Sequence, residues 1–143
     1  MLSVSVFFNV TSLPDSIYEY TKDSLEHMVK EGAFPDLIQV GNEIINGMLW
    51  PVAKVDPLGM ENWDLFVKLL ESGAKACREI CPKAKIIIHT EKAGEWNKIK
   101  TYYNHLWQLD YDIIGLSYYS MWHKAVGVLA ATLDSLAIEF PDK

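Results

Sequence analysis

The sequence predicts an α/β fold in which helices cover a parallel sheet. Two observations support this prediction. Short apolar runs rich in β-branched residues alternate with longer segments whose apolar residues recur at helical spacing. The strand candidates are also apolar on both faces, which is typical of parallel strands. Such alternation places the helices outside the sheet, but periodicity alone does not decide between an open sheet and a closed barrel.

The N-terminal part predicts a weak strand, a helix and a buried strand. Residues 4–10 are the weak strand candidate. A helix follows from Pro14, and it ends at Gly32 because Pro35 prevents its return. The short apolar run at residues 37–40 is predicted to be a buried strand.

The remaining elements continue the alternation. Asn62 is expected to cap the next helix. The other predicted elements are strands at residues 85–89 and 113–118 and helices at residues 63–77, 96–107 and 125–138. No linker, repeat or low-complexity segment divides the chain, so residues 1–143 are expected to form one domain.

Composition narrows the function classes. The chain is 50% hydrophobic and 12% aromatic, with a formal net charge of -6 and no basic cluster, which argues against nucleic-acid binding. No run is long enough to cross a membrane, and the start is not a good signal peptide. Cys77 and Cys81 are expected to be small buried residues. No metal-ligand motif occurs, so neither a metal nor a cofactor is expected.

Polar and aromatic residues gather just after each predicted strand. Asn42, Glu43 and Trp50 follow the strand at residues 37–40, and His89 ends the next strand. The strand at residues 113–118 leads into the last group, which comprises Tyr118, Tyr119, Trp122 and His123. Barrel enzymes build their active sites at this edge from several strand ends.

The pair Asn42–Glu43 is the sharpest chemical feature. Glycoside hydrolysis needs a carboxylic acid that protonates the leaving oxygen and a second carboxylate. Glu43 fits the first role, and Asn42 fits a hydrogen-bond donor to a sugar hydroxyl. Taken as an isolated pair, these residues are more often an exposed loop glutamate beside a turn asparagine.

The aromatic residues have two interpretations. Aromatic faces pack against the C–H faces of pyranose rings, which suits Trp50, Trp122 and the two tyrosines, but packing in the core or in a lid is the alternative. Trp63, Trp96 and Trp107 lie on or near helices and are expected to pack. A lone His89 is more often structural than catalytic.

Longer stretches resemble glycoside hydrolase family 53, the arabinogalactan endo-β-1,4-galactanases. The most specific motifs are VGNEI with GMLWP, followed by GLSYYSMWH at the spacing found here. The resemblance covers about residues 18–140 and matches the region from strand 4 to helix 6 of that family's barrel. It implies a partial (β/α)8 TIM barrel with parallel strands and outer helices, truncated at both ends.

The resemblance also implies a function. Glu43 matches the family's acid/base, Asn42 its partner, and His89, Tyr118 and Trp122 match positions that line the substrate cleft. The implied reaction is retaining hydrolysis of β-1,4-galactan, a polysaccharide substrate. The family's nucleophile belongs to a strand expected after Lys143, so the chain alone is expected to be inactive and to self-associate through open sheet edges. Relatives imply a secreted or cell-envelope protein.

Two alternatives remain at this stage. The chain could be part of a different retaining β-1,4-glycanase. It could also be a non-catalytic sugar-binding or structural remnant. Hydrolysis tests on galactan, mannan and xylan would separate the two enzymes, and binding without turnover would favour the remnant.

Overall fold

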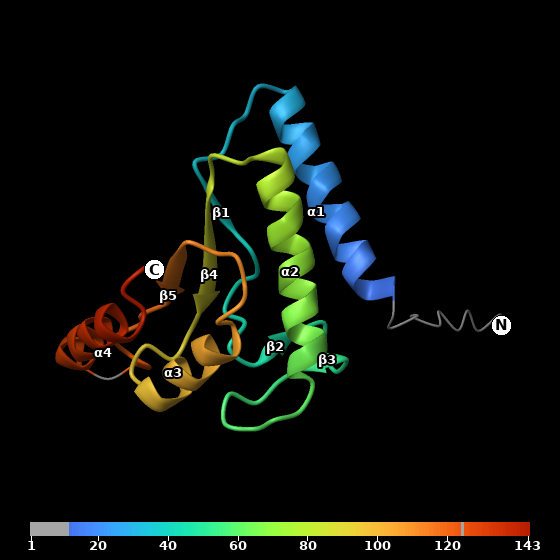
Figure 1. The fold of residues 1–143 in the computed structure, drawn as a ribbon. Helices are drawn as coiled ribbons and strands as arrows, with labels where there is room; N and C mark the ends of the chain where they lie inside the picture. Colours follow the sequence, from blue (N-terminus) through green and yellow to red (C-terminus); the bar gives the residue numbers. More distant parts are fainter. Residues whose placement is uncertain (1–11, 124) are drawn as a thin grey trace.

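A computed structural model describes residues 12–123 and 125–143 (Figure 1). The strand candidate at residues 4–10 lies outside the described residues. In chain order the elements are α1 (Leu13–Lys30), β1 (Leu37–Gln39), β2 (Gly47–Met48), β3 (Ala53–Lys54), α2 (Trp63–Ile80), β4 (Lys85–Thr90), α3 (Trp96–His105), β5 (Ile113–Leu116) and α4 (Val126–Glu139).

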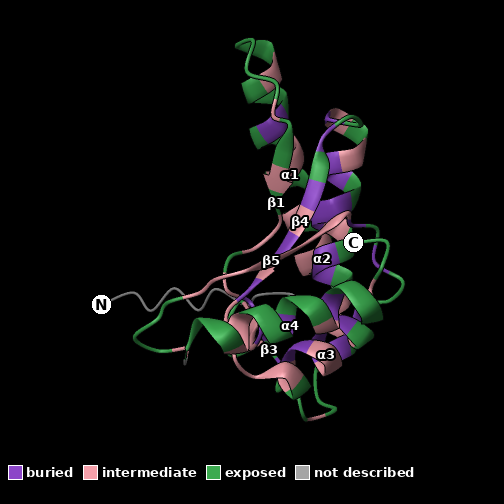
Figure 2. Cartoon of the chain, turned by 90° about the vertical axis from the view of Figure 1, so that its left-hand side faces the viewer, coloured by how far each residue is buried: buried purple, intermediate pink, exposed green. Residues whose placement is uncertain are grey.

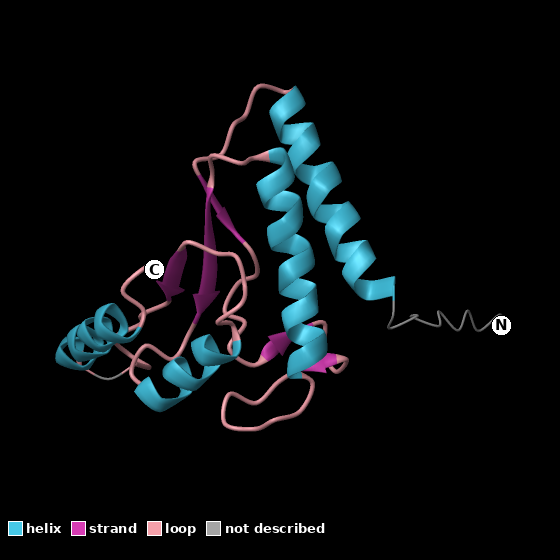
Figure 3. Ribbon diagram, in the orientation of Figure 1, coloured by secondary structure: helices cyan, strands magenta, loops and turns pink. Residues whose placement is uncertain are grey.

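The main sheet is parallel, as the sequence predicts. Its strand order is β1–β4–β5, with β4 in the centre. Ile38 of β1 is paired with Ile86, and His89 of β4 is paired with Gly115 of β5. Figure 3 shows α2 beside this sheet and α1 outside α2. Since all three strands run in the same direction, their carboxyl ends meet at one edge.

The core lies between β4 and the helices that follow and precede it. Ile86, Ile88 and Thr90 alternate along β4 and are buried. Figure 2 shows buried segments along β4. Phe66 of α2 and Tyr102 of α3 are fully buried and pack ring against ring, with centroids 6.0 Å apart. Burying this apolar surface is the main source of the fold's stability.

An ion-pair cluster fixes the start of β5 against β4. Asp112 accepts a hydrogen bond from the Ile86 N–H at 2.8 Å and forms ion pairs with Arg78 at 2.9 Å and Lys85 at 3.2 Å. Burial by itself would raise the pKa of Asp112, but these hydrogen bonds outweigh it and lower the pKa to about 2. The cluster therefore stabilises the sheet at the edge opposite the candidate site.

Three expectations about single elements are wrong. Residues 37–40 do not form a buried strand: Leu37 is 56% exposed because β1 is an edge strand in the described part of the sheet. Trp107 is exposed, since α3 ends before it. Asn62 occupies the N-cap position of α2 but makes no capping hydrogen bond, and its side-chain amide donates to the Lys54 carbonyl at 2.9 Å instead.

Candidate active site at the carboxyl ends of the strands

The residues that follow β1, β4 and β5 meet at one edge of the sheet. Hydrogen bonds continue past the regular strands there: the Ile44 N–H donates to the His89 carbonyl at 3.2 Å, and the Ser117 N–H donates to the Thr90 carbonyl at 2.8 Å. These bonds hold the first turns after the strands in register. The edge therefore presents residues from three separate strand ends close together.

His89 links the two neighbouring strand ends through both of its ring nitrogens. Its Nδ1 accepts a hydrogen bond from the Glu43 N–H at 3.3 Å, and its Nε2 lies 3.0 Å from the Ser117 hydroxyl oxygen. An Nδ1 that accepts a bond carries no proton, so Nε2 carries the proton in the neutral ring and donates to Ser117. His89 thus connects the backbone at Glu43 to the Ser117 side chain.

The chain turns sharply at the candidate acid. Glu43 has a φ of 51° and Gly41 a φ of 82°, both in the left-handed region that only glycine enters without cost. Ile44 and Ile45, directly after the turn, are buried in the core. The two isoleucines hold the strained turn in place, and strain of this kind is often found at functional sites. Glu43 is half-buried as a result.

Asn42 lies in the same turn and is exposed. Gln39 Nε2 donates to the Gly41 carbonyl at 2.9 Å and to Asn42 Oδ1 at 3.2 Å. Because Asn42 Oδ1 is the acceptor in this bond, its side-chain NH₂ group is the part that can donate to a ligand.

A small hairpin, which the sequence analysis did not predict, carries Trp50. Strands β2 and β3 are antiparallel and have two residues each. The Trp50 indole N–H donates to the Asn46 carbonyl at 3.0 Å, and Lys54 Nζ lies 4.6 Å from the centre of the indole ring. The Trp50 side chain is nevertheless 59% exposed. The hairpin therefore presents an oriented aromatic surface near Glu43 in the chain.

The loop after β5 carries the other predicted aromatic residues. The Tyr119 N–H donates to His123 Nδ1 at 3.0 Å, and the Trp122 N–H donates to the Tyr119 carbonyl at 2.9 Å. Tyr118 is half-buried with its ring 6.1 Å from that of His123, whereas Tyr119 and Trp122 are exposed. The loop closes on itself and leaves two aromatic side chains facing solvent.

The structure thus joins His89 directly to Glu43, while Trp50 and the aromatic loop belong to flanking segments. Ser117 is a site residue that the sequence analysis did not single out. It directly follows β5, in the same place that Asn42 and Glu43 occupy after β1, and that position could have indicated it.

Another carboxylate, that of Glu91, follows β4. The Glu91 atom Oε2 is buried without a hydrogen-bond partner. Burial raises the pKa of Tyr102 well above its ordinary value, and the charges of Tyr103 and Glu91 raise it further. Glu91 therefore lies close to the buried tyrosines of α3. Glu95 is held by Lys98, with an N–O distance of 2.6 Å.

The cysteines are free and buried, as expected. Burial is the main reason that the pKa of Cys77 is raised to about 11, and Cys81 is the other free thiol. In residues 12–123 and 125–143, no group of three or more histidine, cysteine, aspartate or glutamate side chains is placed to hold a metal ion. None of the helices described in these ranges is long and apolar enough to cross a membrane.

A half-buried glutamate after the carboxyl end of a parallel strand, with aromatic residues in the flanking loops, is an arrangement that barrel hydrolases use. The comparison with known families agrees with this class. Residues 6–143 match the model of glycosyl hydrolase family 53, and the chain belongs to this family. Its fold is accordingly part of a (β/α)8 barrel.

Individual relatives show how much of that barrel is present. The chain is 35% identical over 130 residues to an uncharacterized protein of Niallia circulans, covering 87% of this chain and 36% of that protein. It is 32% identical over 136 residues to a probable arabinogalactan endo-β-1,4-galactanase A of Aspergillus flavus. This match covers 90% of this chain and 36% of that protein. The chain thus spans a little over a third of the length of these two relatives.

Two solved structures are also similar. A fungal β-1,4-galactanase superposes with a TM-score of 0.84 at 28% identity, covering 94% of this chain and 42% of that one. The family 53 catalytic domain of Ignisphaera aggregans superposes with a TM-score of 0.87 at 28% identity. The superposition covers 96% of this chain and 37% of that domain.

Proposed function

We propose that this chain supplies the acid/base part of an endo-β-1,4-galactanase active site. The observation that carries the proposal is the position of Glu43, on a strained turn whose N–H is held by His89 at the shared edge of the sheet. Family membership and the names of the relatives support β-1,4-galactan, as in type I arabinogalactan, as the polysaccharide substrate.

The proposed reaction proceeds with retention in two steps. Glu43 protonates the leaving glycosidic oxygen while a second carboxylate attacks the anomeric carbon. Glu43 then takes a proton from the water that hydrolyses the glycosyl-enzyme intermediate. Asn42 donates a hydrogen bond to a hydroxyl of the sugar beside the cleaved bond, and His89 positions Glu43 through its backbone.

The aromatic residues complete the proposed site. Trp50, Tyr119 and Trp122 are exposed and offer ring faces to the sugar C–H groups. Tyr118 and His123, whose rings lie 6.1 Å apart in the loop after β5, would line the same cleft.

The chain alone is proposed to be inactive, because retaining chemistry needs two carboxyl groups about 5–5.5 Å apart. Glu91 and Glu95 both follow β4, which is not the strand expected to carry the nucleophile, and Glu95 is paired with Lys98. Reducing-sugar release from β-1,4-galactan by the 143-residue chain is expected to be at background. Turnover that disappears in Glu43→Gln would overturn this part of the proposal.

A chimera tests the role of Glu43 itself. Residues 12–143 would replace the matching segment of the Aspergillus flavus relative, so that the whole barrel is present. Hydrolysis of galactan by the chimera should fall by about 10²-fold or more in Glu43→Gln and stay unchanged in Glu71→Gln, an exposed control on α2. Equal activity of both variants would contradict the acid/base role.

The substrate is tested with the same chimera. Galactan is expected to be hydrolysed in preference to mannan and xylan, whereas preference for another glycan would favour a different β-1,4-glycanase. A chimera that binds galactan oligosaccharides without turnover would favour a sugar-binding remnant, the role that the exposed tryptophans also suit. The family supports export to the cell envelope or beyond, which fractionation of the native host would test.

The chain is also proposed to self-associate through the open edges of its sheet. In the part of the sheet that the structure describes, β1 and β5 are edge strands, and Leu37 on β1 is largely exposed. Open edges of this kind pair with other chains. Sedimentation velocity is expected to show dimers or larger species whose proportion rises with concentration, and a single monomer peak would contradict the expectation.

A further inference from the structure

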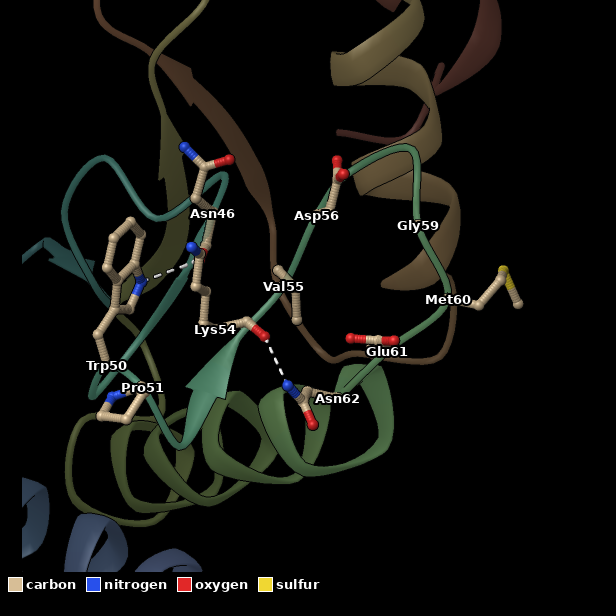
Figure 4. Close-up of a pocket in the computed structure, with 10 residues that line it drawn as sticks. All are labelled: Asn46, Trp50, Pro51, Lys54, Val55, Asp56, Gly59, Met60, Glu61 and Asn62. Atoms are coloured by element: carbon tan, nitrogen blue, oxygen red, sulfur yellow. Dashed lines mark hydrogen bonds between the residues drawn. The ribbon is translucent and has the colours of Figure 1, made fainter.

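A hollow with an exposed tryptophan lies at the edge of the sheet opposite the candidate site. It is separate from the cavity beside the β2–β3 hairpin, which Figure 4 shows with Trp50 and which belongs to the proposed cleft. The hollow lies between the turn after α3 and the segment after α4, and its volume is about 190 Å³. Since Ile113 begins β5 directly after this turn, the hollow is near the amino ends of the strands.

Contacts with the core hold the aromatic walls of the hollow in place. Tyr111 is almost fully buried, and Lys143 Nζ lies 4.3 Å from the centre of its ring and donates to its carbonyl at 2.7 Å. Phe140 packs edge-on against the fully buried Tyr103, with ring centroids 6.0 Å apart. The hollow is therefore preformed, and a ligand would not have to order its walls on binding.

Trp107 is the part of the lining that is open to a ligand. Its side chain is 77% exposed although it lines the hollow. Within the part of the chain that the structure describes, its indole has no hydrogen bond or ring contact. The Tyr111 ring, by contrast, already carries the Lys143 ammonium group. An exposed indole offers a flat apolar face to the C–H groups of a pyranose ring and an N–H donor to a hydroxyl.

The charges around Trp107 balance one another. Glu139 forms an ion pair with Lys100, with an N–O distance of 2.8 Å. Asp142 and Lys143 add one charge of each sign to the lining. Two acidic and two basic groups sum to zero, so neither a basic peptide nor an acidic polymer gains a net attraction. The balance favours a neutral ligand, whose hydroxyl groups the exposed Asp142 carboxylate can bind as an acceptor.

We propose that this hollow is a second, non-catalytic binding site for a neutral polysaccharide, in which Trp107 stacks on one sugar ring. Its volume is below the roughly 300–1,000 Å³ of typical small-molecule sites, so one ring fits while the rest of the polymer stays in solvent. The inference rests on the proposed function, which names the polymer as β-1,4-galactan. Because the hollow and the cleft are at opposite edges, the site would hold the enzyme on its substrate without extending the cleft.

An NMR titration of the ¹⁵N-labelled chain with β-1,4-galactotetraose tests the site. The chain has five tryptophans, whose indole N–H signals report on separate places. The Trp107 indole signal and the amide signals of residues 139–143 are expected to shift and saturate. Shifts confined to residues 42–50, 89 and 117–123 would overturn the proposal. A Trp107 signal that moves with protein concentration alone would also overturn it, because a second copy of the chain would then be the occupant.

Matched variants locate the binding. Trp107→Ala should raise the Kd read from the amide signals of residues 139–143 by about tenfold. Tyr20→Ala removes an equally exposed aromatic side chain on α1 and should leave this Kd unchanged. The same Kd in wild type and Trp107→Ala would contradict the stacking role of the indole.

The galactanase chimera separates this site from the catalytic proposal. Trp107→Ala should raise KM for polymeric galactan by about threefold or more and leave kcat and the hydrolysis of galactotetraose unchanged. Equal losses on both substrates would place Trp107 in the cleft and overturn the second site. An inactive chimera, with binding at Trp107 intact in the 143-residue chain, would refute the catalytic proposal alone. An active chimera that depends on Glu43, without binding at Trp107, would refute the second site alone.

Discussion

The loops that follow β1 and β5 both belong to the candidate site, but they are built in opposite ways. The loop after β1 is anchored in the core: Ile45 is 1% exposed, and Ala53 and Val55 on the hairpin side are buried. The loop after β5 closes through its own backbone and leaves Trp122 77% exposed. The first loop carries the candidate acid, and the second carries aromatic residues.

This difference fits the demands of the proposed chemistry. A group that transfers a proton must be held within a fraction of an ångström of its productive position. An aromatic residue that contacts a flexible polysaccharide can instead be ordered by the substrate itself. Segments with few buried contacts are the ones that open at low free-energy cost. Substitutions in each loop should therefore have very different effects.

The largest effect is expected from the anchor of the first loop. Ile45→Ala would leave a cavity in the core and lower the free energy of unfolding by about 2–5 kcal/mol. Urea unfolding followed by tryptophan fluorescence would measure it. Ile138→Ala, at an exposed position on α4, is the control and should change stability by less than about 0.5 kcal/mol. Similar values for both variants would contradict the anchoring of the loop.

A smaller effect is expected where β5 passes His89. A Cβ atom at Gly115 would lie 2.9 Å from Ile87 Cγ2 and 3.2 Å from His89 Cδ2, so Gly115→Ala must displace one of these side chains. We expect a loss of about 1–3 kcal/mol. A Cβ atom at Gly127 in α4 would meet no described atom within 4 Å beyond its own stretch of helix. Gly127→Ala should therefore be neutral or stabilise the fold by up to about 1 kcal/mol. Thermal unfolding of both variants compares them directly.

At the other end of β5, the stabilising effect of Asp112 is expected to depend on pH. The folded-state pKa of Asp112, about 2, is below the ordinary aspartate value of about 3.9. Its stabilising contribution is therefore present above about pH 4 and is lost as pH falls toward 2. Asp112→Asn should cost about 1–3 kcal/mol at pH 7 and progressively less below pH 4.

Unfolding free energies of wild type and Asp112→Asn across pH 2–7 would test this. Asp134→Asn, an exposed change on α4, is the control. A difference between wild type and Asp112→Asn that stays constant over the whole range would show that the carboxylate charge is not what holds β5 in place.

The smallest effect on stability is expected in the second loop. Trp122→Ala should change the free energy of unfolding by no more than about 0.5 kcal/mol, because the side chain is exposed. In the galactanase chimera the same change should raise KM for galactan. A large loss of stability would show that Trp122 packs against the fold, which would remove the contrast between the loops.

The sequence predicted the α/β order and most helix limits because glycine and proline mark them. Gly32 and Pro35 follow α1, and Pro82 follows α2. The hairpin was missed because two-residue strands show no alternation, and because its turn, residues 49–52, contains none of the Asn-Gly or Asp-Gly pairs that mark tight hairpins. The exposure of Leu37 and Trp107 was not predictable from periodicity, since it depends on which elements lie beside them in space.

The candidate site was predictable as a set of strand-end residues but not as a geometry. The parallel order of the strands was sufficient to bring Glu43 and His89 to one edge. The bond from the Glu43 N–H to the histidine ring depends on the left-handed turn at Glu43, and no local pattern in the sequence announces that turn. The place of Ser117 at the end of β5 could have been noted from the sequence, but its bond to His89 could not.

The two bonds of the His89 ring also make it a spectroscopic probe. An imidazole nitrogen that accepts a hydrogen bond and one that carries a proton resonate far apart in ¹⁵N spectra, and here each nitrogen reports on a different strand end. The Nδ1 signal follows the backbone at Glu43, and the Nε2 signal follows Ser117 after β5. One labelled side chain would thus show which side of the edge a sugar displaces when it binds.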